Sequence, residues 1–167
     1  MKHIVGVADM KLSSQVGDEI VTFALGSCIG ITLYDPITQI GGMVHVMLPT
    51  SAIDCGKAKE NPSMFIDTGV ARLFLESYKL GACKSRLEVT AAGGACTQGP
   101  DDFFQIGKRN IAMLGKLLWK NGISLRASDL AGTAARTMSL TIGTGIVTIR
   151  SNGSVQVLNG NGPGATA

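Results

Sequence analysis

Residues 23–48 read FALGSCIGITLYDPITQIGGMVHVML, and this stretch decides the fold. Two runs, 29–35 and 40–48, are rich in apolar and β-branched residues, which is typical of strands. Asp35 ends the first run and Pro36, Ile37 and Thr38 follow it, with aspartate and proline in the order favoured at the first two positions of a type I turn. The stretch therefore predicts a β-hairpin whose first strand follows a Gly-Ser-Cys turn.

On both sides of this hairpin, along most of the chain, apolar runs end at glycine or other residues common in turns. Further strands are expected at 3–9, 19–25, 86–95, 123–130, 136–142, 145–150 and 154–158. Residues 49–62 are polar, have a proline near each end and are expected to form a loop.

Two stretches have the apolar spacing of amphipathic helices. The first is expected at 64–80, with Ser63 as its N-cap and Gly81 at its end; the second is expected at 106–120 and carries Trp119, expected to serve packing. Many strands with two main helices predict an α+β fold, a layered sandwich of mostly antiparallel or mixed β-sheet. Residues 1–158 are expected to form a single domain, followed by a disordered glycine-rich tail at 159–167.

The composition limits the possible classes of function. The 167 residues are 45% hydrophobic and 16% charged, as in a globular protein with a substantial core. The net charge of +3 comes from scattered basic residues, which argues against a nucleic-acid partner. No apolar run approaches the roughly 20 residues that span a membrane, and no export signal is recognisable. The chain is therefore expected to be cytoplasmic and not membrane-embedded.

Four cysteines could carry chemistry: Cys28, Cys55, Cys83 and Cys96. No two of them form a C-x-x-C pair, and the chain has only two histidines, so neither a metal site nor a disulfide framework is expected. The ordinary interpretation of each is a small buried apolar residue. Cys28 differs from the others because of the hairpin that follows it.

Any even-numbered turn in that hairpin puts Cys28 and His45 on the same face of the sheet. A four-residue turn at 36–39 places Met47 opposite Cys28 and His45 on the diagonal, about 7–8 Å away, whereas a two-residue turn puts the two directly opposite. A histidine beside a thiol can accept its proton, and free backbone N–H groups at Ser27 and Cys28 could stabilise an oxyanion. His45 could equally be a hydrogen-bonded packing residue, and Cys96, after a glycine turn, is the nearest rival nucleophile.

Residues 22–49, TFALGSCIGITLYDPITQIGGMVHVMLP, resemble the start of the CheD family, bacterial chemoreceptor glutamine deamidases. The pattern L-G-S-C followed by G-G-x-x-H is specific. Residues 65–95, 106–110 (IGKRN) and 129–150 are also similar to that family, so that the resemblance runs from about residue 3 to 158.

The resemblance implies an enzyme that converts receptor glutamine side chains to glutamate and releases ammonia, with no cofactor. Cys28 would be the nucleophile, His45 the base, and Thr22 the residue that helps hold the histidine. The implied partners are the cytoplasmic domain of a chemoreceptor and the CheC phosphatase. Related thiol chemistry could also cleave a glutamyl methyl ester, since both reactions share an acyl-enzyme.

The chain departs from the family pattern at Ala131 and Ala135, where glycines are expected. Alanine would be strained there if the backbone has positive φ. Two other classes of function stay open: a non-catalytic adaptor that binds receptors or CheC, and a cysteine peptidase or transglutaminase. Free ammonia without cleavage or cross-linking would select the deamidase.

Overall fold

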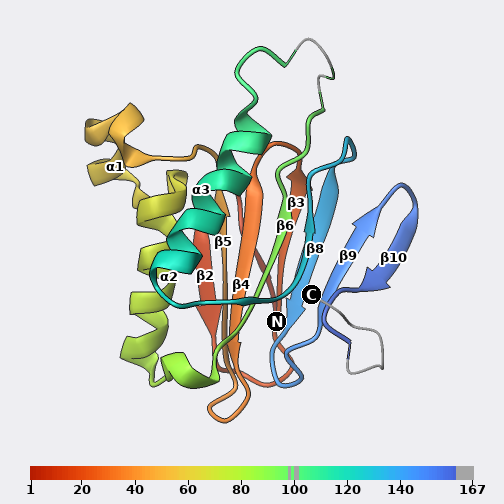
Figure 1. Ribbon diagram of the computed structural model, residues 1–167. Coiled ribbons are helices and arrows are strands. Elements are labelled where there is room, and N and C mark those ends of the chain that lie inside the picture. Colours follow the sequence, from red (N-terminus) through yellow and green to blue (C-terminus); the bar gives the residue numbers. More distant parts are fainter. Residues whose placement is uncertain (98, 100–101, 161–167) are drawn as a thin grey trace.

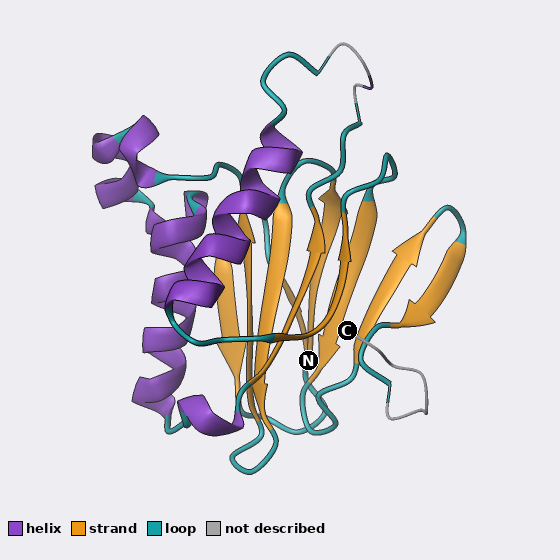
Figure 2. Ribbon diagram, in the orientation of Figure 1, coloured by secondary structure: helices purple, strands orange, loops and turns teal. Residues whose placement is uncertain are grey.

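The computed structural model describes residues 1–97, 99 and 102–160, which form three layers (Figure 1). One layer contains the helices, and two five-stranded mixed sheets form the others. Figure 2 shows the helices gathered on one side of the strands. The predicted α+β layered sandwich with two main helices is confirmed.

The middle layer is a sheet with the strand order β2-β5-β4-β6-β7. Its strands are β2 (Met10–Ser13), β4 (Ile29–Asp35), β5 (Ile40–Val46), β6 (Glu88–Gly93) and β7 (Leu125–Leu130). Only the β6–β7 pair in this sheet is parallel. The two main helices, α2 (Ile66–Leu80) and α3 (Ile106–Lys120), pack on its outer face.

The other sheet has the order β1-β3-β8-β9-β10 and covers the inner face of the middle layer. Its strands are β1 (Lys2–Ile4), β3 (Glu19–Leu25), β8 (Arg136–Thr141), β9 (Val147–Ser151) and β10 (Ser154–Val157). The β1–β3 pair is parallel and the rest are antiparallel.

Alternation along the central hairpin divides the interior into two cores. Ile31 of β4 and Val44 of β5 face the helices, whereas Tyr34 and Met43 face the second sheet. Every residue of β4 and β5 is buried, because both faces of these strands are covered. His45 follows the parity of Met43 and therefore faces the space between the sheets.

The hairpin itself confirms the four-residue turn. Asp35 pairs with Ile40, which leaves residues 36–39 in the loop, and Gly30 pairs with His45. Cys28 lies two residues before Gly30. It therefore has the same parity as Gly30 and lies diagonally across from the histidine.

The other predicted helices and strands agree with the observed ones within about two residues at most ends. The prediction of the N-terminal strand was wrong. The expected strand at 3–9 ends at Ile4, and the chain turns through Ala8, which has φ +58°. The next strand, β2, pairs with β5 and was not expected. A turn residue with positive φ other than glycine or asparagine gives little signal in a sequence.

The segment between β5 and α2 also differs from the expected loop. It contains α1 (Cys55–Glu60), whose first turn is capped by the Asp54 side chain on Lys57 N–H at 3.0 Å. The prediction that Ser63 caps α2 was wrong, because Ser63 lies buried in the 3₁₀ turn Pro62–Met64. Helix α2 instead begins after Phe65, without a side-chain cap.

Two further expectations concern the surface and the C-terminus. Trp119 is 83% exposed and does not pack in the core. Asn159, assigned to the tail, is buried, accepts a hydrogen bond from Val147 N–H and donates one to the Gly145 carbonyl. The rest of the expected tail, 161–167, lies outside the described residues. No helix in the described part of the chain is long and apolar enough to cross a membrane.

Candidate active site

Thr22 and His45 meet in the space between the two sheets. Thr22 lies on β3 of one sheet and His45 on β5 of the other, and both side chains are buried. The threonine Oγ1 lies 2.7 Å from His45 Nδ1 and 2.7 Å from the carbonyl oxygen of Val5. This contact links the two sheets through a single hydroxyl group.

The Val5 carbonyl, the Thr22 hydroxyl and the His45 ring together determine which atoms carry the protons. A carbonyl oxygen can only accept, so the Thr22 hydroxyl donates its one proton to Val5. The same oxygen must then accept from His45, which requires the proton on Nδ1. The other ring nitrogen, Nε2, therefore carries a free lone pair.

That lone pair has no competing partner among the described residues. His45 Nε2 is buried and makes no hydrogen bond there. Burial also lowers the pKa of His45, which favours the neutral ring. An oriented, neutral and unoccupied imidazole nitrogen is what a general base requires.

Cys28 lies at the edge of the same inter-sheet space. It is half-buried and packs against the core between the sheets. Burial raises the pKa of its thiol, partly offset by its own backbone N–H. Within the described residues no hydrogen bond joins Sγ to His45, and burial shifts both pKa values in the direction that favours a neutral thiol and a neutral imidazole.

Gly30 lies on the sheet face between the two side chains, and Leu25 and Met138 pack against it. It pairs directly with His45, and a Cβ at this position would approach Leu25 Cδ1 and Met138 Sδ to 3.0 Å. Because glycine has no side chain, nothing from the paired position stands between the ring and the diagonal Cys28.

The turn that carries Cys28 begins at an irregularity in β3. The register with β8 shifts between Thr22 and Leu25, and Ala24 in the extra length has φ +58°. Such a bulge redirects the chain and places a strained residue beside the site. The strand thus bulges after Thr22, pairs with β8 once more at Leu25, and then turns through Gly26 toward Cys28.

The backbone of this turn is held by its carbonyl groups. The Gly26 carbonyl accepts from Ala95 N–H at 2.8 Å, and the Cys28 carbonyl from Gly94 N–H at 2.9 Å. Gly93 has φ +117°, and a Cβ there would collide with the Cys28 carbonyl. The chain therefore approaches Cys28 at a distance that only glycine permits.

The N–H groups of the turn are left for another partner. No other described residue accepts a hydrogen bond from the N–H of Ser27 or Cys28. Among the described residues the Ser27 N–H is thus unpaired and the Cys28 N–H acts only on its own sulfur, and N–H donors beside a nucleophile are the components of an oxyanion hole. The structure thus joins Thr22 to His45 directly and places Cys28 on the sheet face that His45 shares; the catalytic roles of these residues stay predictions.

The remaining cysteines lack this setting. Cys55 is exposed on α1, and Cys96 donates to the Gly99 carbonyl at 3.4 Å. Cys83 has a lowered pKa because of the Ser85 hydroxyl, but no histidine is bonded to it. The other histidine, His3, is bonded to Asp18 at 2.7 Å.

Two residues that sequence reasoning did not single out hold the surroundings of the site. Asn110 of α3 donates to the carbonyls of Ser27 and Met47, at 2.9 and 3.0 Å. Arg136 donates to the Gly93 carbonyl at 3.3 Å and to the Ala131 carbonyl at 2.6 Å. Both belong to stretches that resembled the CheD family, and that resemblance was the available signal.

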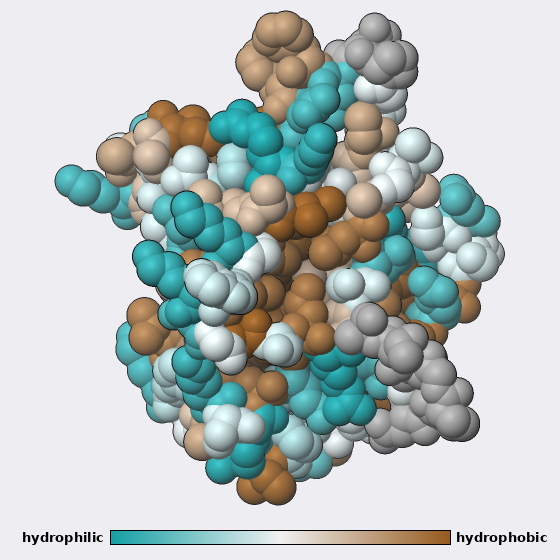
Figure 3. Space-filling view, in the orientation of Figure 1, coloured by the Kyte–Doolittle hydropathy of each residue, from teal (hydrophilic) through white to brown (hydrophobic). Residues whose placement is uncertain are grey.

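The loop between β6 and α3 rises beside the site. It starts at the residues that bond the Cys28 turn, and Thr97 Cγ2 would lie 3.4 Å from a Cβ at Gly26. Its Phe103 and Phe104 are 87% and 68% exposed and contact each other edge to face. The described part of this loop stands at the top of the molecule in Figures 1 and 3, at the end of the middle sheet where the Cys28 turn lies.

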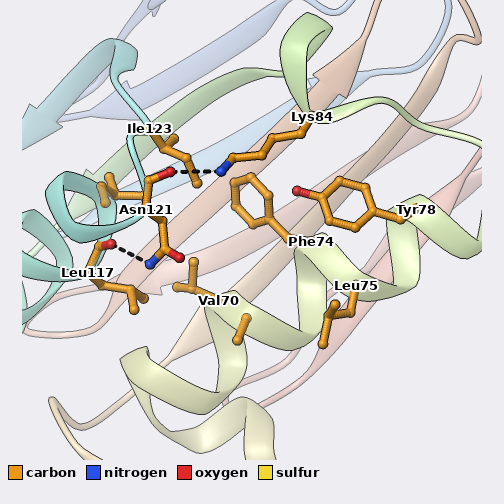
Figure 4. A pocket seen from close by; sticks show the side chains of 10 residues that line it. Val70, Phe74, Leu75, Tyr78, Lys84, Leu117, Asn121 and Ile123 are labelled. Carbon is orange, nitrogen blue, oxygen red and sulfur yellow. Dashed lines mark hydrogen bonds between the residues drawn. The ribbon is translucent and has the colours of Figure 1, made fainter.

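A concave region lies between the helices, and neither Cys28 nor His45 lines it (Figure 4). This groove of about 300 Å³ is lined mainly by apolar side chains such as Val70, Phe74 and Leu117. Its Lys84 ammonium donates to the Asn121 carbonyl, and the Asn121 amide donates to the Leu117 carbonyl. The polar groups of the groove thus serve the local fold, and no nucleophile and base meet there.

Comparison with known proteins identifies the family. Residues 47–151 match the model of the family described as CheD chemotactic sensory transduction. The chain is 45% identical over 150 residues to a probable chemoreceptor glutamine deamidase CheD 1 of Syntrophus aciditrophicus, covering 90% of this chain and 94% of the relative. It is 46% identical to a CheD of Solibacter usitatus (93% and 92% covered) and 41% to one of Thermococcus kodakarensis (93% and 97%), both also named probable chemoreceptor glutamine deamidases. The chain therefore belongs to the CheD family.

Proposed function

We propose that this protein is a protein-glutamine glutaminase that deamidates specific glutamine side chains of chemoreceptors in chemotaxis. The observation that carries the proposal is the hydrogen bond from His45 Nδ1–H to Thr22, which leaves Nε2 free on the sheet face that Cys28 shares. The names of the relatives supply the substrate class. The cytoplasmic domain of the receptor is the proposed substrate, which places the reaction in the cytoplasm.

The first half of the reaction forms a thioester. His45 Nε2 accepts the thiol proton as Cys28 Sγ attacks the carboxamide carbon, and the N–H groups of Ser27 and Cys28 stabilise the oxyanion. The protonated His45 then gives this proton to the departing nitrogen. Ammonia leaves, and the glutamyl group is bound to sulfur.

The second half regenerates the enzyme. His45, again neutral, accepts a proton from a water molecule that attacks the thioester carbon. The carbon–sulfur bond breaks, the thiolate takes the proton from His45, and glutamate is released. Thr22 holds the ring in one tautomer throughout, because its oxygen accepts only from Nδ1–H. A glutamyl methyl ester would pass through the same thioester.

The burial of both groups explains why a neutral pair suits this chemistry. A thiolate and an imidazolium in the inter-sheet space would each lose hydration. Proton transfer during attack avoids a long-lived charge pair. The thiol is therefore expected to be moderate in reactivity until a carboxamide is positioned beside it.

The surface around the site supports a protein substrate. Phe103 and Phe104 are exposed and contact each other on the loop that starts at the residues bonded to the Cys28 turn, and exposed apolar residues gathered at one place commonly mark an interaction surface. A second candidate function uses the same surface: an adaptor that binds receptors or the CheC phosphatase without chemistry. An adaptor would need neither the Thr22–His45 bond nor the free N–H groups.

The deciding experiment incubates the protein with a receptor cytoplasmic domain and measures ammonia and the masses of receptor peptides. We expect ammonia release with glutamine converted to glutamate, and neither cleavage nor cross-linking. The His45→Asn variant should remain folded by circular dichroism, bind the receptor and release no ammonia; Cys55→Ala serves as the matched control and should behave as wild type. Binding without ammonia release by the wild-type protein would select the adaptor.

A further inference from the structure

Asn110 lies where α3 touches the backbone of the Cys28 turn. It is 0% exposed and stands near the start of the helix, within the sequence IGKRN at 106–110. Gly107, one turn earlier on the same face, approaches so closely that a Cβ there would lie 2.5 Å from the Ala95 carbonyl oxygen. The helix therefore rests directly on the segment that bonds the Cys28 turn.

The amide of Asn110 joins two carbonyl groups that belong to different strands. Nδ2 donates to the Ser27 carbonyl at 2.9 Å and to the Met47 carbonyl at 3.0 Å. Ser27 precedes Cys28, and Met47 follows the strand end that carries His45. Both acceptors are carbonyls, so the orientation of the amide is fixed: the reverse orientation would set oxygen against oxygen.

The oxygen atom of the Asn110 amide indicates that a contribution to stability alone does not explain why asparagine stands at this position. Asn110 Oδ1 is buried and has no hydrogen-bond partner among the described residues. An unsatisfied buried acceptor destabilises the folded state. The residue nevertheless supplies two N–H groups from one atom, which no apolar side chain can do.

We propose that Asn110 is a positioning residue, which holds the Cys28 turn at a fixed separation from the end of the His45 strand. The inference rests on the proposed function, because it assigns a role in the same reaction. Without this link, the turn keeps the bonds of its Gly26 and Cys28 carbonyls to Ala95 and Gly94, but the Ser27 carbonyl between them is no longer joined to the end of β5. Displacement of a reacting group by about 1 Å can reduce a rate roughly 100-fold.

The test uses Asn110→Asp, which keeps the shape of the side chain and removes the NH₂ group. We expect kcat for ammonia release to fall roughly 10- to 100-fold with little change in KM. Asn121→Asp is the matched control, because Asn121 lies at the end of the same helix and its amide bonds only the Leu117 carbonyl. A folded Asn110→Asp variant with wild-type kcat would overturn the proposal.

A second readout separates positioning from general stability. The rate of Cys28 alkylation by iodoacetamide at neutral pH is measured in four proteins: the wild type, His45→Ala, Asn110→Asp and the double variant. The alkylation of Cys83 in each protein is the internal reference. If Asn110 positions the pair, His45→Ala should slow alkylation in the wild type and change it less than twofold in Asn110→Asp. If His45→Ala slows alkylation by the same factor in the wild type and in Asn110→Asp, the two residues act independently and the proposal is wrong.

Two further outcomes are decisive. Asn110→Ser keeps one donor and should retain intermediate activity; if both Asn110 variants fail to fold, the residue serves the stability of the fold and the proposal is wrong. If the wild type releases no ammonia but Cys28 alkylation still depends jointly on His45 and Asn110, the positioning role stands and the proposed function fails.

Discussion

The two ends of strand β4 are built differently. At one end Asp35, with a 0% exposed side chain, accepts from the Arg86 guanidinium and from the N–H groups of Ile37, Thr38 and Cys83. At the other end, beside Cys28, His45 Nε2 and Asn110 Oδ1 have no partner in the described part of the chain. The same strand thus ends in a fully paired network on one side and beside unpaired buried polar atoms on the other.

This difference indicates how stability and reactivity are divided along one strand. Buried polar groups that are fully paired fix the fold, and unpaired ones are costly and concentrate where chemistry occurs. Changes at the Asp35 end should therefore affect unfolding, whereas changes at the Cys28 end should affect turnover.

The largest expected effect is that of Cys28→Ala on turnover. Loss of the nucleophile should reduce kcat at least about 1,000-fold while the thermal unfolding midpoint stays near that of the wild type. The ammonia assay and a thermal melt are measured together. Cys83→Ala, Cys96→Ala and Cys55→Ala should each keep most of the activity; a Cys28 variant that still deamidates would refute the mechanism.

At the opposite end, Asp35→Asn should lower the free energy of unfolding by about 2 kcal/mol and leave kcat nearly unchanged. The Arg86 hydrogen bonds hold the pKa of the Asp35 carboxyl well below its usual range. Because this pKa is lower in the folded state, the interaction stabilises the fold above about pH 4 and is lost as the pH falls below it. Denaturant unfolding at pH 7 and pH 3 measures this.

The comparison for Asp35→Asn is Glu76→Gln, which removes an exposed pair with Lys79 on α2. This control should change stability little at either pH. Equal losses in the two variants would contradict the assignment of Asp35 as a stabilising centre.

The pH dependence of kcat/KM should have a broad plateau. Burial lowers the pKa of His45, so the acidic limb should lie below about pH 6.5; burial raises the pKa of Cys28, so the alkaline limb should lie above about pH 8.5. Activity should fall about tenfold per pH unit on the acidic limb, where His45 is protonated. An acidic limb centred above pH 7 would argue against a buried neutral base.

Thr22→Val should have a smaller effect, roughly tenfold on kcat, because one neutral hydrogen bond is lost and the imidazole tautomer is no longer fixed. Thr22→Ser keeps the hydroxyl and should restore most of the activity. Steady-state kinetics of the pair provide the measurement, and equal activity in Val and Ser variants would show that the hydroxyl has no role in turnover.

The smallest effect concerns the backbone of the loop after β7. Ala131 has φ +70°, a conformation that costs an alanine about 1 kcal/mol, whereas Ala135 has no positive φ. Ala131→Gly should therefore raise the free energy of unfolding by about 1 kcal/mol, and Ala135→Gly should not. Stabilisation by both or by neither would contradict the strain argument.

The parts of this site that lie close in sequence were predictable, and those that meet across layers were not. The alternation of residues 29–48 and the Asp-Pro turn predicted the hairpin and the shared face of Cys28 and His45. The Thr22–His45 bond joins strands of different sheets, for which spacing carries no signal, and its expectation came from family resemblance alone. Asn110 was unpredictable for the same reason, since it reaches two backbone carbonyls.

The elements that were missed share a physical cause. Helix α1 is short and polar and depends on the Asp54 cap instead of an apolar stripe, so its sequence resembles a loop. Strand β2 follows a turn through an alanine with positive φ, which propensities do not anticipate. Trp119 occupies a helix position next to the apolar stripe and faces outward, which spacing alone does not decide.

The groups proposed for catalysis come from all three layers: Thr22 from one sheet, Cys28 and His45 from the other, and Asn110 from the helix layer. A chain that has formed only one sheet, or that has not yet docked α3, holds the thiol and the imidazole without a fixed separation. A partly folded chain would then carry the reactive residues without the activity.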